Sequence, residues 1–415
     1  MTPTLLTLLN LALFALSALI LVVDRVYGLF ATALLLSAIG LLLRDRERRL
    51  PLLDSEKLLL AAFCVYPAVV ALGMLIHGNW HWGEFANPGR LLLVLPVFLA
   101  VRRFGVAKEW FYLGLMAGAV GAGCFGFYQK YLLQLTVAHG HIHKIQFGDI
   151  SLMLGVLSLT YAIGDRAERL NKLLLIGALL AFAFGVMGSI TSGTRGGWIA
   201  VPLMMWLILR EAIQHKPIRF AAYGLFLASA MTAYGTNQLV QYKVDKAAQD
   251  VAGYFADQQR VAGSAGTRFE MWRAAGIMFM RAPLIGVGLG NYGPELVKLV
   301  DQGRIDGSVR TFGHAHNDYL HVAAEQGLLG LGGFLLFYAL LLRFFLQHFV
   351  VSRRLAAAGL LLAFGFIDFG LTQALFKHAI STVFVALYGA VLAGMLCHQR
   401  RLTSGDSDNQ QGTTG

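Results

Sequence analysis

Long apolar blocks without charges recur along this chain, and they constrain its fold more than any other feature. Three examples are "LLTLLNLALFALSALILVV" (5–23), "LLLIGALLAFAFGVMGSI" (173–190) and "STVFVALYGAVLAGMLC" (381–397). Each is long enough to cross, as a helix, a hydrocarbon core of about 30 Å. Lipid offers the backbone no hydrogen-bond partners, so only helices and closed barrels span membranes. Because the blocks lack the period-two alternation of barrel strands, they predict an all-α polytopic membrane protein.

About twelve spans are expected when the blocks are followed along the 415 residues, of which only 14% are charged. A soluble protein would have about a quarter charged residues. The expected spans cover roughly 5–23, 27–43, 58–76, 89–101, 110–130, 146–164, 173–190, 198–209, 220–237, 319–342, 355–376 and 380–397. The first block lacks the basic start and the small-residue cleavage site of a signal peptide, so none is expected.

Basic residues are concentrated in alternate loops, and this asymmetry predicts the orientation. The short loops of one set hold only Arg25, Arg90, Lys144, Arg195 and Lys377, whereas the other set is rich in Lys and Arg. Basic loops stay in the cytoplasm, so both termini are expected there. The net charge of +11 is therefore a topology signal and implies no nucleic-acid partner.

The predicted spans divide the chain into four parts. Residues 1–237 hold about nine spans, 238–318 form one large outward-facing loop, 319–397 hold about three spans, and 398–415 form a polar tail expected to be disordered. A loop of that length usually has a function. The three cysteines, Cys64, Cys124 and Cys397, all lie in apolar blocks, so disulfides and cysteine-based metal sites are not expected.

"GLGNYG" (288–293) matches the G-x-G-x-x-G pattern of dinucleotide-binding folds. That interpretation requires a preceding strand and a following helix in a βαβ unit. Here Pro283 and a predicted amphipathic helix precede the motif on the outer face. A glycine-rich turn is the better interpretation.

Two outward-facing arginines are candidates for binding phosphate. Arg195 lies in the hairpin "TSGTRGGW" (191–198), among glycines that would let the backbone approach a phosphate. Snorkelling to lipid headgroups explains it equally well. Arg268, in "SAGTRFEMW" (264–272), lies near the start of a predicted helix, with Trp272 one turn further on the same face. Free N–H groups at a helix start favour an anion, although a solvated loop arginine is the simpler interpretation.

"GHAHNDYLHV" (313–322) places three histidines within nine positions at the start of a span. His314 and His316 precede a helix cap at Asn317 or Asp318, and His321 and Glu325 are one turn apart. The histidines could bind zinc together with "HGHIH" (139–143), but no acidic cluster accompanies them. A general base suits a histidine at a capped helix start better, and a polar interfacial loop is the remaining alternative. No metal or cofactor is expected.

The motifs "SGTRGGW" (192–198), "GTRFEMWRAAGIMFMRAPLIGVGLGNYG" (266–293) and "HAHNDYLHVAAEQGLLGLGG" (314–333), in this order, resemble the bacterial O-antigen ligase and polymerase superfamily. The chain is most similar to the lipopolysaccharide O-antigen ligases. The resemblance implies a GT-C-type glycosyltransferase architecture in the bacterial inner membrane. It also implies metal-independent, inverting transfer of O-antigen from undecaprenyl diphosphate to a sugar hydroxyl of lipid A core on the periplasmic side.

The resemblance also implies roles for particular residues. His316 corresponds to the essential histidine of the family, and His314 beside it is a credible second base. Arg195 and Arg268 correspond to the arginines that would bind the diphosphate. Glu325 or Asp318 would orient the base or substitute for it. Three further residues are expected to support the site: Asn317, Trp272 and Tyr319.

Two other functions remain open at this point. An O-antigen polymerase or a protein O-oligosaccharyltransferase of the same superfamily would share the arginines and the histidine, and would differ in the acceptor. A transporter would use Asp368, within "LLAFGFIDFGLTQ" (361–373), as an intramembrane coupling group. Transporters usually contain internal repeats, and none is recognisable between the two halves of the chain.

Overall fold

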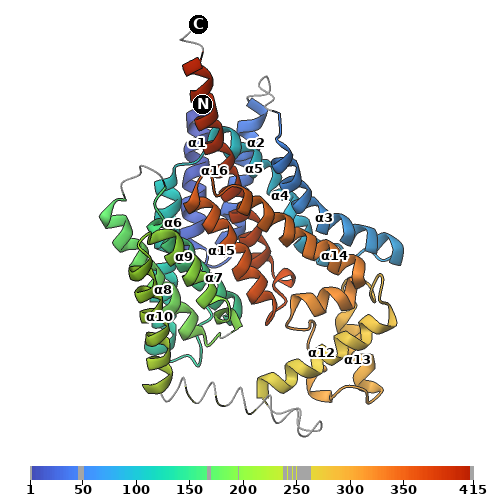
Figure 1. Cartoon of the computed structure of the whole chain (residues 1–415). Helices are drawn as coiled ribbons and strands as arrows, with labels where there is room; N and C mark the ends of the chain where they lie inside the picture. The colour runs from blue at the N-terminus through green and yellow to red at the C-terminus, as the bar shows by residue number, and fades with distance from the viewer. Residues whose placement is uncertain are drawn as a thin grey trace.

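The structure, a computed structural model, describes residues 2–44, 51–165, 170–194, 196–236 and 263–411, with the isolated positions 241, 245 and 249. Every regular element in these residues is a helix, so the predicted all-α fold is confirmed (Figure 1). The two ends of the chain lie at the same end of the molecule, and α12 and α13 lie at the opposite end.

The first half of the chain forms these elements: α1 (Thr2–Leu19), α2 (Val26–Arg44), α3 (Asp54–His77), α4 (Trp82–Leu93), α5 (Leu95–Phe104), α6 (Lys108–Phe127), the π-helix η1 (Tyr128–Leu132), α7 (Lys144–Leu159), η2 (Thr160–Ala162) and α8 (Lys172–Ser192). The second half forms η3 (Gly196–Trp198), α9 (Val201–Ala212), α10 (Lys216–Thr236), α12 (Gly263–Arg281), α13 (Tyr292–Asp301), η4 (Gly307–Val309), α14 (Asp318–Gln347), α15 (Arg353–Gly370), η5 (Leu375–Lys377) and α16 (Ala379–Gln411).

Each of the twelve apolar segments expected to span overlaps helix, but within the described residues only eight helices are long and apolar enough to cross a membrane. These include Trp82–Phe104, in which α4 and α5 form one span. Four expected spans are not among the eight: α1, α9, α10 and α15. The helix α9 has only 12 residues, and α15 carries three charged residues among its 18. The chain is therefore a polytopic helical membrane protein with eight candidate spans.

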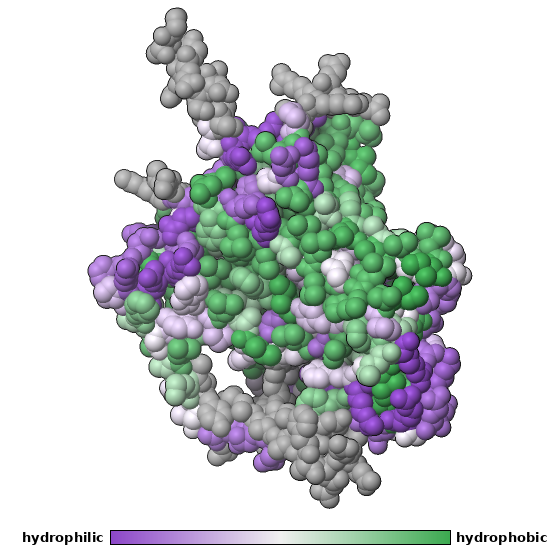
Figure 2. All heavy atoms as spheres, turned by 45° about the vertical axis from the view of Figure 1, so that its right-hand side comes forward, coloured by the Kyte–Doolittle hydropathy of each residue, from purple (hydrophilic) through white to green (hydrophobic). Residues whose placement is uncertain are grey.

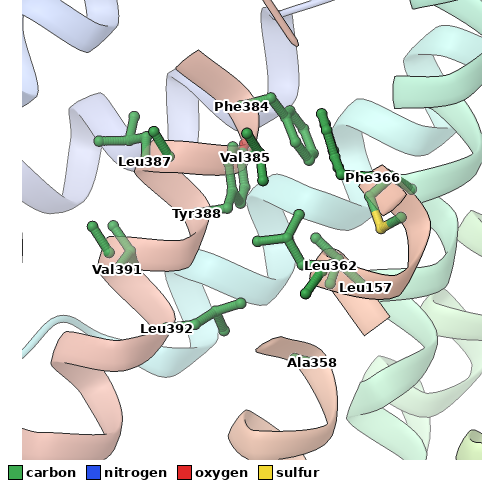
Figure 3. Close-up of a cluster of buried hydrophobic side chains, with 14 of the residues drawn as sticks. Leu157, Ala358, Leu362, Phe366, Phe384, Val385, Leu387, Tyr388, Val391 and Leu392 are labelled. Atoms are coloured by element: carbon green, nitrogen blue, oxygen red, sulfur yellow. The ribbon is translucent and has the colours of Figure 1, made fainter. Parts of the chain in front are cut away.

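Among the candidate spans, α7 and α16 are the most buried, and α2 and α8 are the least buried. Aromatic and aliphatic side chains from α7, α15 and α16 meet at the centre, where Phe384 stacks on Tyr388 with ring centroids 4.2 Å apart (Figure 3). On the outside, apolar residues cover the middle of the face in Figure 2, and hydrophilic residues gather at its upper end and lower right. This distribution fits a protein surrounded by lipid at mid-height.

A second, smaller core belongs to the large loop between α10 and α14. It joins α12 and α13 to the start of α14 through buried side chains that include Met271, Tyr292, Val309 and Ala324. Tyr292 donates from its hydroxyl to the carbonyl of Met271 at 2.8 Å. The described part of the loop is thus a packed lobe, which fixes α12 relative to the start of α14.

α14 is broken at Gly327, where φ is 63° and ψ is −159°. Residues 283–288, which we call the strap, lie against the break. Four backbone hydrogen bonds of 2.7–3.1 Å join the strap to α14, with the donor named first: Val287 to Ala324, Gly288 to Glu325, Leu328 to Pro283, and Leu329 to Leu284. Non-helical backbone at membrane depth is tolerated only where protein or water satisfies it, and here the strap does so.

The strap contains the first glycine of the G-x-G-x-x-G motif, so the motif has a structural purpose. No strand precedes it among the described residues, and a helix follows only at Tyr292. Within the motif, Gly288 and Gly290 have φ values of 97° and 80°, which favour glycine. Gly286, two positions before the motif, is also required, because a Cβ there would lie 2.3 Å from the backbone nitrogen of Gln326. The expected glycine-rich turn is confirmed.

At the opposite end of the molecule from the lobe, a buried ion pair joins α3 to α5. Arg102 Nε lies 2.7 Å from Glu56 Oε1, and the side chains are 6% and 1% exposed. Removing one member of such a pair leaves a buried charge without its partner, which is strongly destabilising. Some of the basic residues that predict the orientation therefore also hold helices together.

The tail, expected to be disordered over 398–415, differs from expectation up to Gln411. α16 continues from its span to that residue, and only 412–415 lie outside the described part of the tail. Extending an existing helix avoids the cost of nucleating a new one, which accounts for helix in a polar sequence.

Candidate active site

The histidine motif lies at the capped start of α14. Asn317 is the cap, since its side-chain oxygen accepts a hydrogen bond from Leu320 N at 2.9 Å. Its amide nitrogen donates to the carbonyl of Leu371 at 3.0 Å, which ties the motif to the segment after α15. Of the two residues expected to cap the helix, Asn317 does so, and Asp318 is the first residue of the helix.

His316 has a backbone conformation that is costly for a residue with a side chain. Its φ of 49° lies in the left-handed region. The flanking residues hold it there, because Asn317 is fixed by its two hydrogen bonds and Ala315 O accepts from the indole nitrogen of Trp272 at 3.0 Å. Such conformations persist only where the surroundings enforce them, and they concentrate at functional sites. Trp272 thus contacts the histidine loop through this hydrogen bond.

The rings of His314 and His316 lie side by side, with centroids 4.2 Å apart. His314 Nδ1 accepts a hydrogen bond from the backbone nitrogen of His316 at 3.3 Å. Burial, with the neighbouring charge of Arg268, lowers the pKa of His316 to about 4, although a hydrogen bond with Gln373 acts in the opposite direction. Burial, with the charge of His316, lowers the pKa of His314 to about 2. Both rings are therefore neutral at pH 7.

The two arginines expected to bind diphosphate have different outcomes. Arg268 lies in the second turn of α12, and its charge acts on His316 and on Asp149 of α7. It thus lies near the predicted base, although the two residues are far apart in the sequence. Arg195 falls outside the described residues, so its role stays a prediction.

The hairpin around position 195 packs against the end of α15. A Cβ on Gly196 would lie 1.8 Å from Thr372 Oγ1, and one on Gly197 would lie 2.5 Å from the ring of Phe369. Close packing, rather than approach to a phosphate alone, therefore requires these glycines. On the other side, Thr194 Oγ1 donates to the carbonyl of Lys144 at 3.2 Å. The hairpin is thus held next to the segment that contacts Asn317.

Glu325 and Asp318 have partners other than His316. Glu325 Oε2 lies 3.4 Å from His321 Nε2, and its other oxygen accepts from Tyr292 N at 3.1 Å. Asp318 accepts from Phe376 N at 3.2 Å. The two carboxylates thus hold the first half of α14 against α13 and η5.

Tyr319 also joins the start of α14 to a neighbouring helix. Its hydroxyl donates to the carbonyl of Ile367 in α15 at 2.9 Å. Together with the bond from Asn317 to Leu371, this contact fixes the start of α14 along the end of α15. Tyr319 therefore supports the site through position rather than through contact with the histidine rings.

The segment after α15, residues 371–378, belongs to the site, and sequence reasoning did not include it. Gln373 is fully buried, and its amide interacts with His316 and lies 3.4 Å from His378 Nε2. The ring of His378 lies 5.7 Å from that of His314 and stacks on His143 at 6.4 Å. Burial lowers the pKa of His378 to about 4. Burial also lowers the pKa of His143 from its ordinary value. The signal available in the sequence was the presence of polar residues between the last two expected spans.

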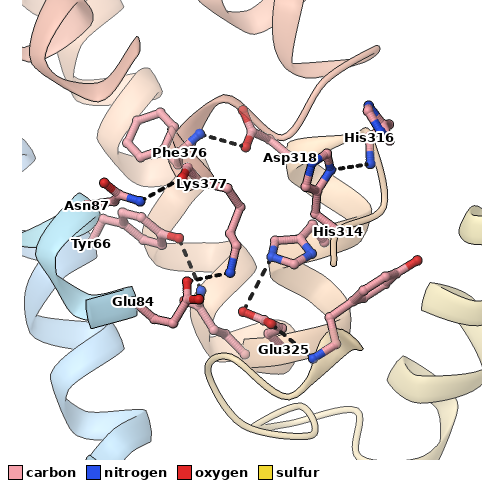
Figure 4. Close-up of polar contacts among 12 residues, drawn as sticks. Tyr66, Glu84, Asn87, His314, His316, Asp318, Glu325, Phe376 and Lys377 are labelled. Carbon is pink, nitrogen blue, oxygen red and sulfur yellow. Dashed lines mark hydrogen bonds and ion pairs between the residues drawn. The ribbon is translucent and has the colours of Figure 1, made fainter. Parts of the chain in front are cut away.

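Lys377 connects the histidine cluster to α4. Its ammonium pairs with Glu84, and its backbone carbonyl accepts from the Asn87 amide at 2.9 Å (Figure 4). The charge of Lys377 acts on both His314 and His378 and opposes their protonation. The site therefore has a cation on the side of α4 as well as one on the side of α12.

Asp368, the candidate coupling group of a transporter, has a structural role. One of its oxygens accepts from Ala200 N at 2.9 Å and so holds the start of α9. In the part of the chain that the structure describes, no group of three or more His, Cys, Asp or Glu residues could hold a metal ion. The histidine cluster instead offers neutral rings between two cations, an arrangement suited to proton transfer next to an anion.

The fold and this site define a polytopic helical membrane protein with a candidate active site of histidines and arginine at one end of its spans. Residues 178–335 match the model of the O-antigen ligase family. The match runs from α8 to the second half of α14, and it includes Arg195, Arg268 and His316. It confirms the resemblance to the O-antigen ligase superfamily that the sequence predicted.

A relative in Haemophilus influenzae strain Rd, described as an uncharacterized protein, is 28% identical over 305 residues. The aligned region covers 72% of this chain and 75% of the relative. Most of both chains is therefore similar, beyond the part that matches the family model.

Proposed function

We propose that this protein transfers O-antigen polysaccharide from undecaprenyl diphosphate to a sugar hydroxyl of lipid A core. The acceptor hydroxyl attacks C1 of the reducing-end sugar and gives its proton to His316. The bond from C1 to the diphosphate oxygen breaks, and undecaprenyl diphosphate leaves with the electron pair. Direct displacement of this kind inverts the anomeric centre.

One observation carries the proposal: His316 is half-buried and neutral, and the charge of Arg268 acts on it. A neutral imidazole can accept a proton, and a general base contributes about 10²–10⁴ in rate. Its Nδ1 atom has no hydrogen-bond partner among the described residues. His314 is then a positioning residue, because it accepts from the backbone nitrogen of His316.

Arg268 and Arg195 would stabilise the leaving group. Negative charge grows on the diphosphate as the glycosidic bond breaks, and fixed cations aimed at that charge lower the barrier. Binding of the anionic donor would also offset the charge of Arg268 next to His316. That change favours the protonated ring, so the donor would make His316 a stronger base once it is bound.

The proposed topology has twelve spans, a GT-C-type arrangement, cytoplasmic termini and a site that faces the periplasm of a bacterial inner membrane. The basic loops of the sequence support it. In Figure 1 both ends of the chain lie at one end of the helices, and α12 lies at the other. Metal-independent chemistry is part of the proposal, since the one Asp-x-Asp pair of the sequence, Asp406 and Asp408, lies in the tail expected on the cytoplasmic side.

Transfer in vitro with a defined lipid-linked donor tests the proposal. Purified protein should attach the glycan to lipid A core, and it should do so in EDTA. Activity that EDTA abolishes and zinc restores would instead support a metal site at the histidines. A deletion strain should keep its lipid A core, lose attached O-antigen and accumulate lipid-linked polymer. Short attached chains would instead identify a polymerase, and transfer to protein alone would identify an oligosaccharyltransferase.

A further inference from the structure

A groove of about 420 Å³ lies between α2, the α4–α5 span and α16, and no histidine of the cluster lines it. Its volume is within the range of about 300–1,000 Å³ typical of ligand sites. Its walls are apolar, with side chains that include Leu35, Leu93, Val97, Val383 and Leu387. Two arginines, Arg25 and Arg90, also line it, and both belong to the segments expected to face outward.

Arg90 is the more informative of the two because it lies within the candidate span Trp82–Phe104. Its guanidinium donates to the side chain of Asn87 at 2.5 Å, and no carboxylate pairs with it among the residues the structure describes. A charge within a span is costly unless it faces water, a counter-ion or a headgroup. The groove is the place where Arg90 could meet an anion.

Arg25 adds a second cation at the same groove. It lies in the turn between α1 and α2 with a φ of 55°, and its distance to Asp24 is 3.7 Å with both side chains exposed. Exposed pairs of this kind are weak, so Arg25 remains available to another anion. Two arginines above an apolar groove match an amphiphile with a phosphate headgroup, since guanidinium binds phosphate through two parallel hydrogen bonds.

The groove is connected to the candidate active site. Asn87 accepts from Arg90 and donates to the carbonyl of Lys377, whose charge acts on His314 and His378. Arg268, assigned above to the donor diphosphate, approaches His316 from α12 instead. The two lipids of a transfer reaction must reach the base from different directions. The donor is assigned to the side of Arg268 and α12, so the groove on the side of α4 is available to the acceptor.

We propose that this groove binds the acceptor glycolipid, with its phosphate on Arg90 and Arg25 and an acyl chain along α2 and α16. The inference rests on the proposed function, because it assumes that the reaction joins two lipids. It adds a binding site and the chemical feature recognised there, a phosphate on the acceptor.

Two variants test the two halves of the site. Arg90→Gln removes the headgroup contact. Gly28→Phe fills the groove, since a Cβ at Gly28 meets nothing within 4 Å. Arg44→Gln is the matched control, because it removes an exposed arginine at the other end of α2. With lipid A core as acceptor, each test variant should raise the KM for acceptor by about 10- to 100-fold, as expected for losing a charge-assisted hydrogen bond or blocking the chain.

The KM for the lipid-linked donor should stay unchanged in both variants, and Arg44→Gln should behave as wild type. An unchanged KM for acceptor in both test variants would overturn the proposal. A rise in the KM for donor instead would assign the groove to the donor lipid and also overturn it.

A binding measurement keeps this test separate from the proposed function. Native mass spectrometry of the detergent-solubilised full chain would use lipid A with its phosphates, the same lipid after dephosphorylation, and phosphatidylglycerol. Wild-type protein should retain phosphorylated lipid A, and Arg90→Gln should not. Equal retention of dephosphorylated lipid A, or displacement by phosphatidylglycerol, would refute the groove assignment. If binding is as expected but wild-type protein transfers no glycan, the proposed function is refuted, whereas the assignment of the groove to a phosphorylated glycolipid still stands.

Discussion

Gly327→Ala tests whether the break in α14 is built into the fold. With φ at 63° and ψ at −159°, Gly327 occupies a region that is essentially closed to other residues. Strain of this kind costs about 1–3 kcal/mol. A Cβ there would also lie 2.4 Å from the backbone carbon of Leu284 and 2.5 Å from the nitrogen of Ile285. Both are backbone atoms, so the strap would have to move.

Moving the strap would break the four hydrogen bonds between it and α14, each worth about 1 kcal/mol net. We therefore expect Gly327→Ala to lower the free energy of unfolding by about 3 kcal/mol or more. The control is Gly332→Ala in the same helix, where a Cβ meets nothing within 4 Å. It should be neutral or stabilise by about 0.5–1 kcal/mol, because alanine is the better helix former.

Thermal unfolding of the two purified variants in the same detergent measures the difference. Transfer activity should fall in Gly327→Ala, because the strap also holds the segment that carries Glu325 and, one turn earlier, His321. An unchanged unfolding temperature for Gly327→Ala, or equal losses in both variants, would refute the reasoning that only glycine permits the break.

The remaining predictions concern the candidate site and one ion pair. His316→Gln should lower kcat by about 10²–10⁴, and His314→Gln by about tenfold or less, since it loses one hydrogen bond; comparable losses would leave the base unassigned between them. The acid limb of kcat/KM should lie near pH 4 rather than at the ordinary 6.5, because His316 is neutral above its lowered pKa, and Arg268→Gln should move that limb upward. Arg268→Lys should impair transfer at normal expression, because lysine keeps the charge but not the bidentate geometry; full activity would contradict diphosphate binding. Arg102→Met should lower the free energy of unfolding by about 3–5 kcal/mol, measured by thermal unfolding, because Glu56 would stay buried without the guanidinium of Arg102. Adding Glu56→Gln should recover part of that loss.

Part of the candidate site could be predicted from the sequence because it depends on local chemistry. The capping role of Asn317 follows from a short polar residue before an apolar run, and the His321–Glu325 pair follows from their i, i+4 spacing. The predicted topology put Arg268 and His316 on the same side of the membrane, the family resemblance gave them roles in one site, and the structure brings the charge of Arg268 close to His316. Position 195 lies outside the described residues, so its place in the site stays a prediction.

The other part of the site depends on contacts between segments far apart in the sequence. Gln373, Lys377 and His378 reach the histidines because Asn317 and Asp318 bind the backbone of that segment. Nothing in the spacing of residues near His378 indicates this, because each hydrogen bond joins residues more than 50 positions apart. The carboxylates were expected to orient the base, yet in the structure they pair with His321, Tyr292 and Phe376.

An all-helical membrane protein with a large loop before α14 could be predicted from the amino-acid sequence alone. The reason is that hydrophobicity over about 20 residues is a local property, and lipid leaves the backbone no alternative to helix. Three features are visible only in the folded structure: α14 is broken, a glycine-rich strap satisfies the break, and α4 and the segment after α15 contribute to the candidate site. These features depend on which backbone groups approach each other closely enough to bond, and that distance is set by the packing of the whole bundle.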